Sequence, residues 1–185
     1  MPVSSTRLRP RTPPAGQARR RADHAPLVLG IDPGLHHTGY GAVELREGRP
    51  YLREAGVLST CAGDTLGVRL HQLHRDVEHL LRDVRPDVVV VEDLFVHGQF
   101  PRTAITLGHA RGVIYLAATS AAVEIMELAP SVVKQAVAGN GRASKTQVQA
   151  SIRVLLGVRG LADPHAADAL ALAYAGLYRA RAARR

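Results

Sequence analysis

The sequence predicts a single α/β domain built on a mixed five-stranded sheet with helices on both faces. Three strand-like segments come first and read as a meander, and helical and strand-like segments alternate after them. Two apolar runs, Leu27–Asp32 and Asp87–Glu92, lack polar alternation, which is typical of strands buried on both faces. Many functions share such a layout, so the function has to be argued from the site.

The first half of the folded region is predicted to be a hairpin added to a buried strand. Leu27–Asp32 is stopped by Pro33-Gly34, and the segments Thr38–Leu45 and Tyr51–Ser59 flank the turn-like Glu47–Pro50. A long helix follows, with Asp64 as its expected N-cap and Pro86 after its end. Its apolar positions have helical spacing: Leu66, Leu70, Leu73, Val77, Leu80, Leu81 and Val84.

The second half alternates helix and strand and then ends in helices. The expected elements are helix Arg102–Thr119, strand Val123–Leu128 and helix Ser131–Ala138. Ser144 and Gln147 fit a capping box, which predicts a helix that ends near Gly157. Asp163 directly before Pro164 predicts the start of the last helix, because proline suits the first helical position.

Composition excludes several classes of protein. Hydrophobic residues make up 46% of the chain, which is typical of a globular protein, and the one cysteine, Cys61, excludes a disulfide framework and a thiolate zinc site. No run of 18 apolar residues is present, so no membrane span is expected. The N-terminus lacks the apolar core of a signal peptide, and we therefore expect a cytoplasmic location.

The net charge of +8 is concentrated at the two ends. Residues 1–26 carry +5 and include five prolines, which predicts a flexible basic extension. Residues 178–185 carry +4 and are expected to form a basic tail, whereas residues 27–177, the expected folded domain, carry −1. Basic arms could bind phosphates without sequence preference, or they could serve only solubility.

Acidic residues end both apolar strands. If those strands are neighbours, Asp32 and Glu92 emerge at one edge of the sheet, whereas Asp93 points to the opposite face. His165 and Asp168 share one face in the first turn of the last helix. Together the four residues suggest a metal site of carboxylates and imidazole. Each acid taken singly also has a structural explanation. An Asp before Pro-Gly often only forms a turn, and an Asp in the first turn of a helix often only interacts favourably with the helix dipole.

Six short segments give the chain a recognisable pattern. They are Leu29–Gly41 (LGIDPGLHHTGYG), Val91–Phe95 (VEDLF), Leu107–Gly112 (LGHARG), Ala129–Val137 (APSVVKQAV), Lys145–Gln149 (KTQVQ) and Ala166–Ala171 (AADALA). Because these segments occur in the order and at the spacing of that family, the chain resembles the RuvC family of Holliday junction resolvases across about residues 27–175.

The resemblance implies a ribonuclease-H-like fold and a homodimer that nicks two strands of a four-way DNA junction symmetrically, in recombination and repair. It also implies two Mg²⁺ or Mn²⁺ ions per site and cooperation with a branch-migration helicase complex. The acidic cluster of the family maps onto Asp32, Glu92, His165 and Asp168. His165 departs from many members, which carry Asp there, and imidazole is a less natural magnesium ligand than carboxylate.

Four residues are candidates for DNA contact. Lys134 and Lys145 fall in the family segments, and Arg142 precedes the helix that Ser144 caps, where backbone amides could hold a phosphate. Phe95 follows Glu92 closely and could stack on bases at an opened junction. Alternatively, the two lysines are ordinary surface charges and the aromatic side chain anchors its loop.

Small residues recur every four positions in the helix over 102–119. Ala104, Gly108 and Gly112 would let a second helix approach closely, which suggests a symmetric dimer interface, with packing on the sheet as the alternative. Two other functions stay open from the residues alone. An Asp-Pro-Gly hairpin can begin an actin-like ATPase, and loss of a metal position at His165 would leave a junction-binding module without activity.

Overall fold

The computed structural model describes residues 26–93, 101–158 and 163–183, and they form an α/β domain on one five-stranded sheet. The strand order is β3-β2-β1-β4-β5, in which β1 pairs antiparallel with β2 and parallel with β4. The mixed sheet expected from the sequence is therefore confirmed. Its strands are β1 (Leu27–Asp32), β2 (His37–Arg46), β3 (Arg49–Ser59), β4 (Val88–Glu92) and β5 (Glu124–Leu128).

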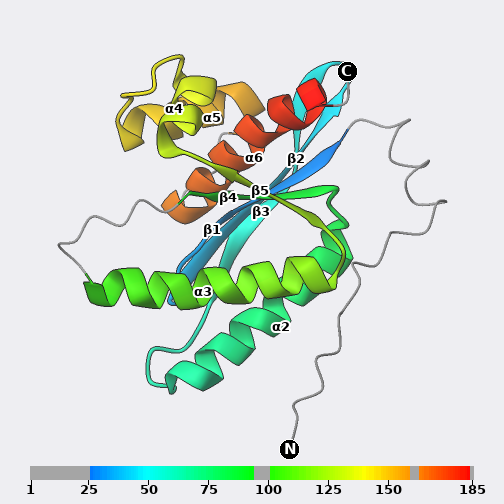
Figure 1. Ribbon diagram of the computed structural model, residues 1–185. Helices are drawn as coiled ribbons and strands as arrows, with labels where there is room; N and C mark the ends of the chain where they lie inside the picture. Colours follow the sequence, from blue (N-terminus) through cyan, green and yellow to red (C-terminus); the bar gives the residue numbers. More distant parts are fainter. Residues whose placement is uncertain (1–25, 94–100, 159–162, 184–185) are drawn as a thin grey trace, which may run out of the picture.

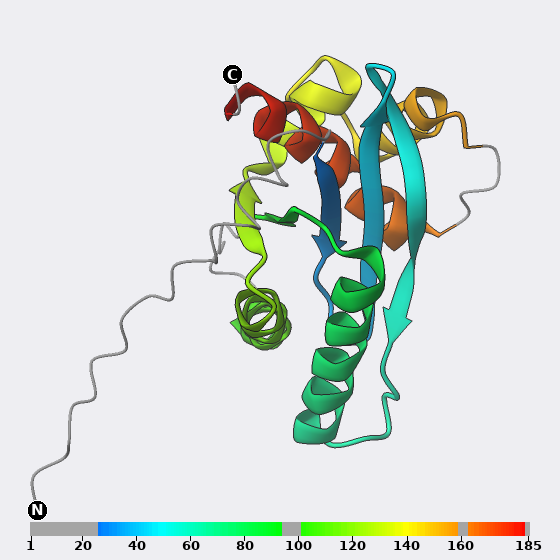
Figure 2. The same ribbon diagram turned by 90° about the vertical axis from the view of Figure 1, so that its right-hand side faces the viewer.

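Helices cover both faces of the sheet (Figures 1 and 2). One face carries α2 (Leu66–Val84) and α3 (Pro101–Ser120), and the other carries α4 (Pro130–Ala138), α5 (Lys145–Leu156) and α6 (Pro164–Ala183). Strand alternation gives each face its own core. Val28 and Val90 pack toward α6, whereas Leu29, Val89 and Val91 pack toward α2 and α3.

Local chemistry accounts for most helix boundaries. The capping box of Ser144 and Gln147 is present at the start of α5, and the αL residue Gly157 ends that helix. Asp163 caps α6, since its carboxylate accepts hydrogen bonds from the amides of His165 at 2.8 Å and Ala166 at 3.3 Å. These three boundaries were correctly predicted.

The predicted N-cap of α2 was wrong. Thr65 occupies that position, without a side-chain cap hydrogen bond. Asp64 instead belongs to the preceding turn, where its amide donates to the carbonyl of Cys61 at 3.2 Å. The helix ends before Pro86 as expected, with Arg85 in the left-handed region as its C-cap.

The hairpin turn between β2 and β3 is shorter than predicted. Glu47 and Gly48 have φ values of 52° and 77°, as a two-residue turn with left-handed residues requires. Arg49 and Pro50 therefore already belong to β3, where Pro50 pairs with Leu45. Proline is tolerated there because β3 is an edge strand of the long hairpin (Figure 2).

Two strand glycines let α6 lie directly on the sheet. A Cβ added to Gly30 of β1 would lie 2.0 Å from the carbonyl oxygen of Ala169, and one added to Gly39 of β2 would lie 2.1 Å from that of His165. Because no side chain separates these backbones, the first turn of α6 reaches the end of β1. This contact decides where the residues of α6 stand relative to Asp32.

The helix α6 also runs further than expected. The basic tail predicted to begin at residue 178 begins inside α6, which continues to Ala183, and Ala180 is buried in the core that α6 shares with α4 and α5. The small side chain of Ala180 extends the packed face of this helix past Leu177. In the part of the chain that the structure describes, no helix is long and apolar enough to cross a membrane.

Replacement of Gly30 by alanine tests the close approach of α6. We expect Gly30→Ala to lower the free energy of unfolding by at least about 2 kcal/mol, because the added methyl must displace backbone atoms. Urea denaturation measures this change. The control is Gly67→Ala in α2, where an added Cβ meets nothing within 4 Å, so stability should stay equal or rise slightly. Equal stability of the two variants would contradict the role given to Gly30.

Candidate active site

Two carboxylates leave the sheet side by side. Ile31 of β1 pairs with Val91 of the parallel strand β4, so the next residues, Asp32 and Glu92, end the two strands at the same edge. Both lie on the α6 face, in line with Val28 and Val90 of the core on that side. The prediction that the two strands are neighbours and that Asp32 and Glu92 emerge at the same edge is therefore confirmed.

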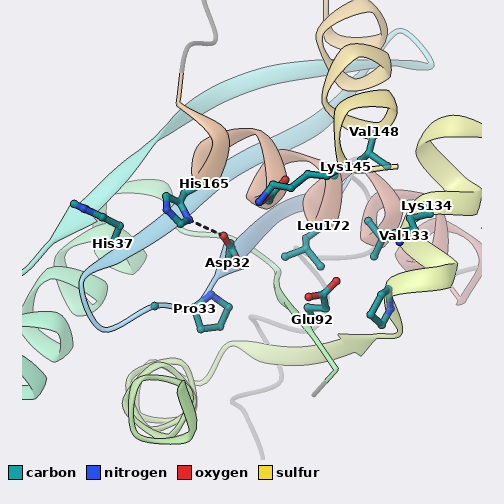
Figure 3. Close-up of a pocket in the computed structure, with 14 residues that line it drawn as sticks. Asp32, Pro33, His37, Glu92, Val133, Lys134, Lys145, Val148, His165 and Leu172 are labelled. Carbon is teal, nitrogen blue, oxygen red and sulfur yellow. Dashed lines mark hydrogen bonds and ion pairs between the residues drawn. The ribbon is translucent and has the colours of Figure 1, made fainter. Parts of the chain in front are cut away.

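The first turns of α6 bring the other two predicted residues to the same place. His165 Nδ1 lies 3.1 Å from Asp32 Oδ2, and Figure 3 shows these side chains pointing toward each other. Asp168 pairs with Lys145 of α5, whose Nζ lies 2.6 Å from Oδ2, and Gln149 Nε2 donates to Oδ1 of the same carboxylate at 3.2 Å. Asp32 and Asp168 thus each have a basic partner.

These groups surround one cleft of about 520 Å³ between the sheet edge, α4, α5 and α6 (Figure 3). Lys134 of α4 and Lys145 of α5 stand among the acids that line the cleft rather than apart from them. The polar residues that line it include Asp32, Glu92, Lys134, Lys145, His165 and Asp168.

Burial and crowding of like charges disfavour the ionised acids. Burial raises the pKa of Asp32 above its usual value, and the Asp168 carboxylate adds to this effect, while the hydrogen bond from His165 opposes it. Burial also raises the pKa of Glu92, with Asp32 and Asp168 adding to the shift and Lys134 and Lys145 opposing it. The cleft is therefore a place where added positive charge would be favourable.

The donor set fits a hard divalent cation. Carboxylate oxygen is the ligand that Mg²⁺ prefers, and imidazole is also accepted by Mn²⁺ and other transition metals. In residues 26–93, 101–158 and 163–183, no three acidic, His or Cys side chains converge as a ready-made cage for one ion. Magnesium usually keeps several waters and takes only one or two carboxylates, so a pair from Asp32, Glu92 and Asp168 suffices for each ion.

The other predicted contacts differ in their placement. Arg142 is exposed just before α5, outside the set of residues that line the cleft, and its amide donates to the Asn140 side chain at 2.9 Å. Phe95 lies outside the described residues. Gly108 and Gly112 are exposed on α3, and an added Cβ at either would meet nothing within 4 Å, whereas Ala104 is half-buried. The alternative prediction, that the two glycines pack on the sheet instead of forming a dimer face, is therefore wrong.

Among the polar residues that line the cleft, one was missed by the sequence reasoning. His37, at the start of β2, lines the cleft with its ring stacked on His36 at 4.4 Å between centroids and 5.8 Å from the His165 ring. Its Nδ1 lies 3.0 Å from Ser59 Oγ on β3. The signal was present in the two histidines that follow the Pro33-Gly34 turn beside Asp32, but only the hairpin geometry places one of them in the cleft.

Neutralisation of one carboxylate should stabilise the protein when no metal is present. We expect Asp32→Asn to raise the melting temperature in EDTA by about 2 °C or more, because an amide avoids the cost of a half-buried charge beside Glu92 and Asp168. The folded pKa of Asp32 lies above its unfolded value, so wild-type stability falls as pH rises through that interval. The difference between the proteins should thus be small near about pH 4 and fully present at about pH 7.

The same melting experiment carries its own controls. Added Mg²⁺ should raise the melting temperature of the wild type more than that of Asp32→Asn, because a bound ion stabilises the fold only where its ligands remain. Glu124→Gln removes an exposed carboxylate at the start of β5 and should change neither quantity. A lower melting temperature for Asp32→Asn in EDTA at neutral pH would contradict this account of the site.

Comparison with known proteins agrees with the family resemblance found in the sequence, along almost the whole described chain. A family model described as crossover junction endodeoxyribonuclease RuvC matches residues 28–175. A relative of that name from Rhodopirellula baltica is 42% identical over 159 residues, which cover 85% of this chain and 89% of the relative. Another from Chloroflexus aurantiacus is 44% identical over 154 residues, which cover 83% and 93%.

Solved structures agree with the sequence comparisons. The structure of Thermus thermophilus RuvC in complex with Holliday junction substrate matches with a TM-score of 0.79 and 35% identity, covering 86% of this chain and 97% of that one. The yeast mitochondrial Holliday junction resolvase, at 14% identity and a TM-score of 0.61, supports the fold alone. The ribonuclease-H-like fold is confirmed, and the actin-like alternative is not supported. The chain belongs to the RuvC family of crossover junction endodeoxyribonucleases.

Proposed function

We propose that this protein resolves Holliday junctions by hydrolysing a phosphodiester bond in each of two symmetry-related strands. The observation that carries the proposal is the cleft in which the strand-end acids Asp32 and Glu92 face His165 and Asp168 of α6, with lysines among them. Membership in a family of crossover junction endodeoxyribonucleases supports both the reaction and the DNA structure on which it acts.

The four predicted site residues have roles that follow from their positions and contacts. Asp32 and Glu92 are fixed by strand pairing and would hold divalent cations, together with Asp168 and His165. Bound there, such ions would polarise the scissile phosphate and lower the pKa of the attacking water. His165 orients the Asp32 carboxylate through its Nδ1 contact. We propose two Mg²⁺ or Mn²⁺ ions per site, with His165 favouring Mn²⁺.

The lysines supply the positive charge that draws a phosphate into an acidic cleft. Lys145 pairs with Asp168 directly at 2.6 Å, and the charge of Lys134 opposes the rise that burial causes in the pKa of the Glu92 carboxyl. Both can turn their ammonium groups toward a DNA backbone, because long flexible stems carry them. We propose that they contact the phosphates of the cut strand, while exposed Arg142 contacts a phosphate outside the cleft.

A second copy of the chain is the proposed partner of α3. Gly108 and Gly112 lie on an exposed face of this helix with Ile105 and Leu116, residues that are 60% and 59% exposed. Small and apolar residues on one face permit close contact between two copies of α3, and a two-fold junction needs two identical sites. Ala104, half-buried, is proposed to lie at the margin of this interface.

Three further expectations stay predictions. Phe95 is proposed to wedge between bases at the junction centre. Residues 1–26 are proposed to form a basic extension to the nuclease domain, and only Pro26 of them lies in the described part of the chain. A branch-migration helicase complex is the proposed protein partner, on the family resemblance alone.

The direct test is a cleavage assay on a labelled synthetic four-way junction, with linear duplex as the control substrate. Mg²⁺, Mn²⁺ and EDTA are compared in parallel. Symmetric nicks in the junction alone, abolished by EDTA, are expected. Junction binding without nicks in any metal would instead support a binding module that has lost activity, and would contradict the proposed reaction.

Asp168→Asn separates binding from cleavage. We expect this variant to bind the junction at least as tightly as the wild type, because one repulsion toward phosphate is removed, and to cut at least about 100-fold more slowly. Gel shift in EDTA and single-turnover cleavage measure the two effects. The matched control is Asp163→Asn at the N-cap of the same helix, where Asn caps as well as Asp and cleavage should be retained. Wild-type cleavage by Asp168→Asn would remove this carboxylate from the mechanism.

Gly108→Leu tests the dimer face. Apart from the adjoining backbone of α3, an added Cβ would meet nothing within 4 Å in the described chain, and leucine favours helix, so the fold of one copy should be as stable as before or more so. The dimer should nevertheless dissociate at concentrations where the wild type is dimeric, as measured by light scattering. An unchanged dimer in Gly108→Leu would show that the interface lies elsewhere.

A further inference from the structure

A polar network lies behind the cleft, on the α2–α3 face of the sheet where β4 ends. Its centre is Arg111 of α3, which is only 8% exposed. Arg111 Nη1 donates to the backbone carbonyl of Glu92, and Nη2 donates to the hydroxyl of Tyr115 and lies 3.3 Å from Glu127 Oε1. The Tyr115 hydroxyl donates in turn to Glu127. The network thus joins α3 to β4 and β5.

The partners of Arg111 offset the cost of burying it, because removing a guanidinium from water costs free energy unless the group is paired and hydrogen-bonded. Glu127 balances the charge, and Tyr115 holds both partners in place. Burial and the hydrogen bond to Glu127 raise the pKa of Tyr115 to about 12, so its hydroxyl keeps its proton. Tyr115 and Glu127 therefore hold the guanidinium in one orientation through Nη2, and in that orientation Nη1 donates to the Glu92 carbonyl.

That carbonyl belongs to a peptide unit held at both of its polar atoms. Arg111 binds the carbonyl oxygen of Glu92, and the amide of Asp93, in the same peptide, donates to the Leu128 carbonyl at 2.9 Å. Because this peptide is planar and held at both polar atoms, it limits rotation about the Cα of Glu92 and so restricts the direction of the Cα–Cβ bond. Since side chains alternate along a strand, the Glu92 carboxylate leaves toward the cleft on the opposite face.

We propose that Arg111, held by Tyr115 and Glu127, is a positioning residue that orients the Glu92 carboxylate for its work in the cleft. Arg111 does not line the cleft, so it acts only through the backbone of Glu92. The proposal rests on the proposed function of that cleft. A displacement of about 1 Å at a reacting group can cost about 100-fold in rate, so a loosened peptide should be felt in the chemical step.

The test compares full-length wild type with Arg111→Met, Arg111→Lys and Tyr115→Phe. Arg75→Met, an exposed arginine on α2, is the matched control. Each protein is assayed for junction affinity in EDTA, for single-turnover cleavage at saturating junction over a range of Mg²⁺ concentrations, and for the Mg²⁺-dependent rise in melting temperature without DNA. All assays are run well below each melting temperature.

We expect Arg111→Met to keep junction affinity within about 3-fold while its maximal cleavage rate falls by about 10-fold or more. The Mg²⁺ concentration for half-maximal rate should rise, and the Mg²⁺-dependent melting shift should shrink. Arg111→Lys, which keeps one donor for the carbonyl, should recover part of each quantity. Tyr115→Phe, which loses one partner of the guanidinium, should show the same changes at smaller size.

A purely structural role for Arg111 predicts a different result. Arg111→Met would then melt earlier but match Arg75→Met in cleavage rate, Mg²⁺ requirement and Mg²⁺-dependent melting shift, and this would overturn the proposal. If Arg111→Met does not fold, the Lys and Phe variants decide the matter by the same three quantities. If the wild type does not cut junctions, the proposed function fails, while the melting shift measured without DNA still tests the link between Arg111 and the metal-binding carboxylates.

Discussion

The close contact between α6 and the sheet is the constraint on which the site depends. Gly30 and Gly39 leave the strands β1 and β2 bare where the helix crosses them, so that backbone packs on backbone. Any side chain at these positions would lift α6 and move His165 and Asp168 away from Asp32. The Asp163 cap starts the helix beside the strand ends, and the two glycines determine how deep it lies.

Crowding of acids in the cleft works against stability and in favour of function. Burial and mutual repulsion raise the pKa values of Asp32 and Glu92, so the folded protein holds these groups at a cost. Lys145 and His165 reduce that cost by direct contacts with Asp168 and Asp32. The remaining negative charge attracts divalent cations, and cations let an acidic cleft accept DNA phosphates.

The two faces of the sheet carry different parts of the proposed machinery. The α6 face carries the cleft, whereas the α2–α3 face carries the network of Arg111, Tyr115 and Glu127 and the exposed glycine face of α3. Glu92 belongs to both, since its side chain enters the cleft and its carbonyl contacts α3. The end of β4 therefore links the helix of the proposed dimer interface to the proposed catalytic carboxylates, through the backbone of Glu92.

The sequence by itself determined the element order, the strand ends at Asp32 and Glu92, and the caps of α5 and α6, because periodicity, apolar runs and capping are local properties. It also contains six ordered segments that are sufficient to indicate the family. Only the tertiary structure decided that His37 and both lysines line the cleft, that Thr65 rather than Asp64 caps α2, and that Arg111 reaches the Glu92 carbonyl. These depend on packing between residues far apart in the chain, and no local pattern encodes such distances.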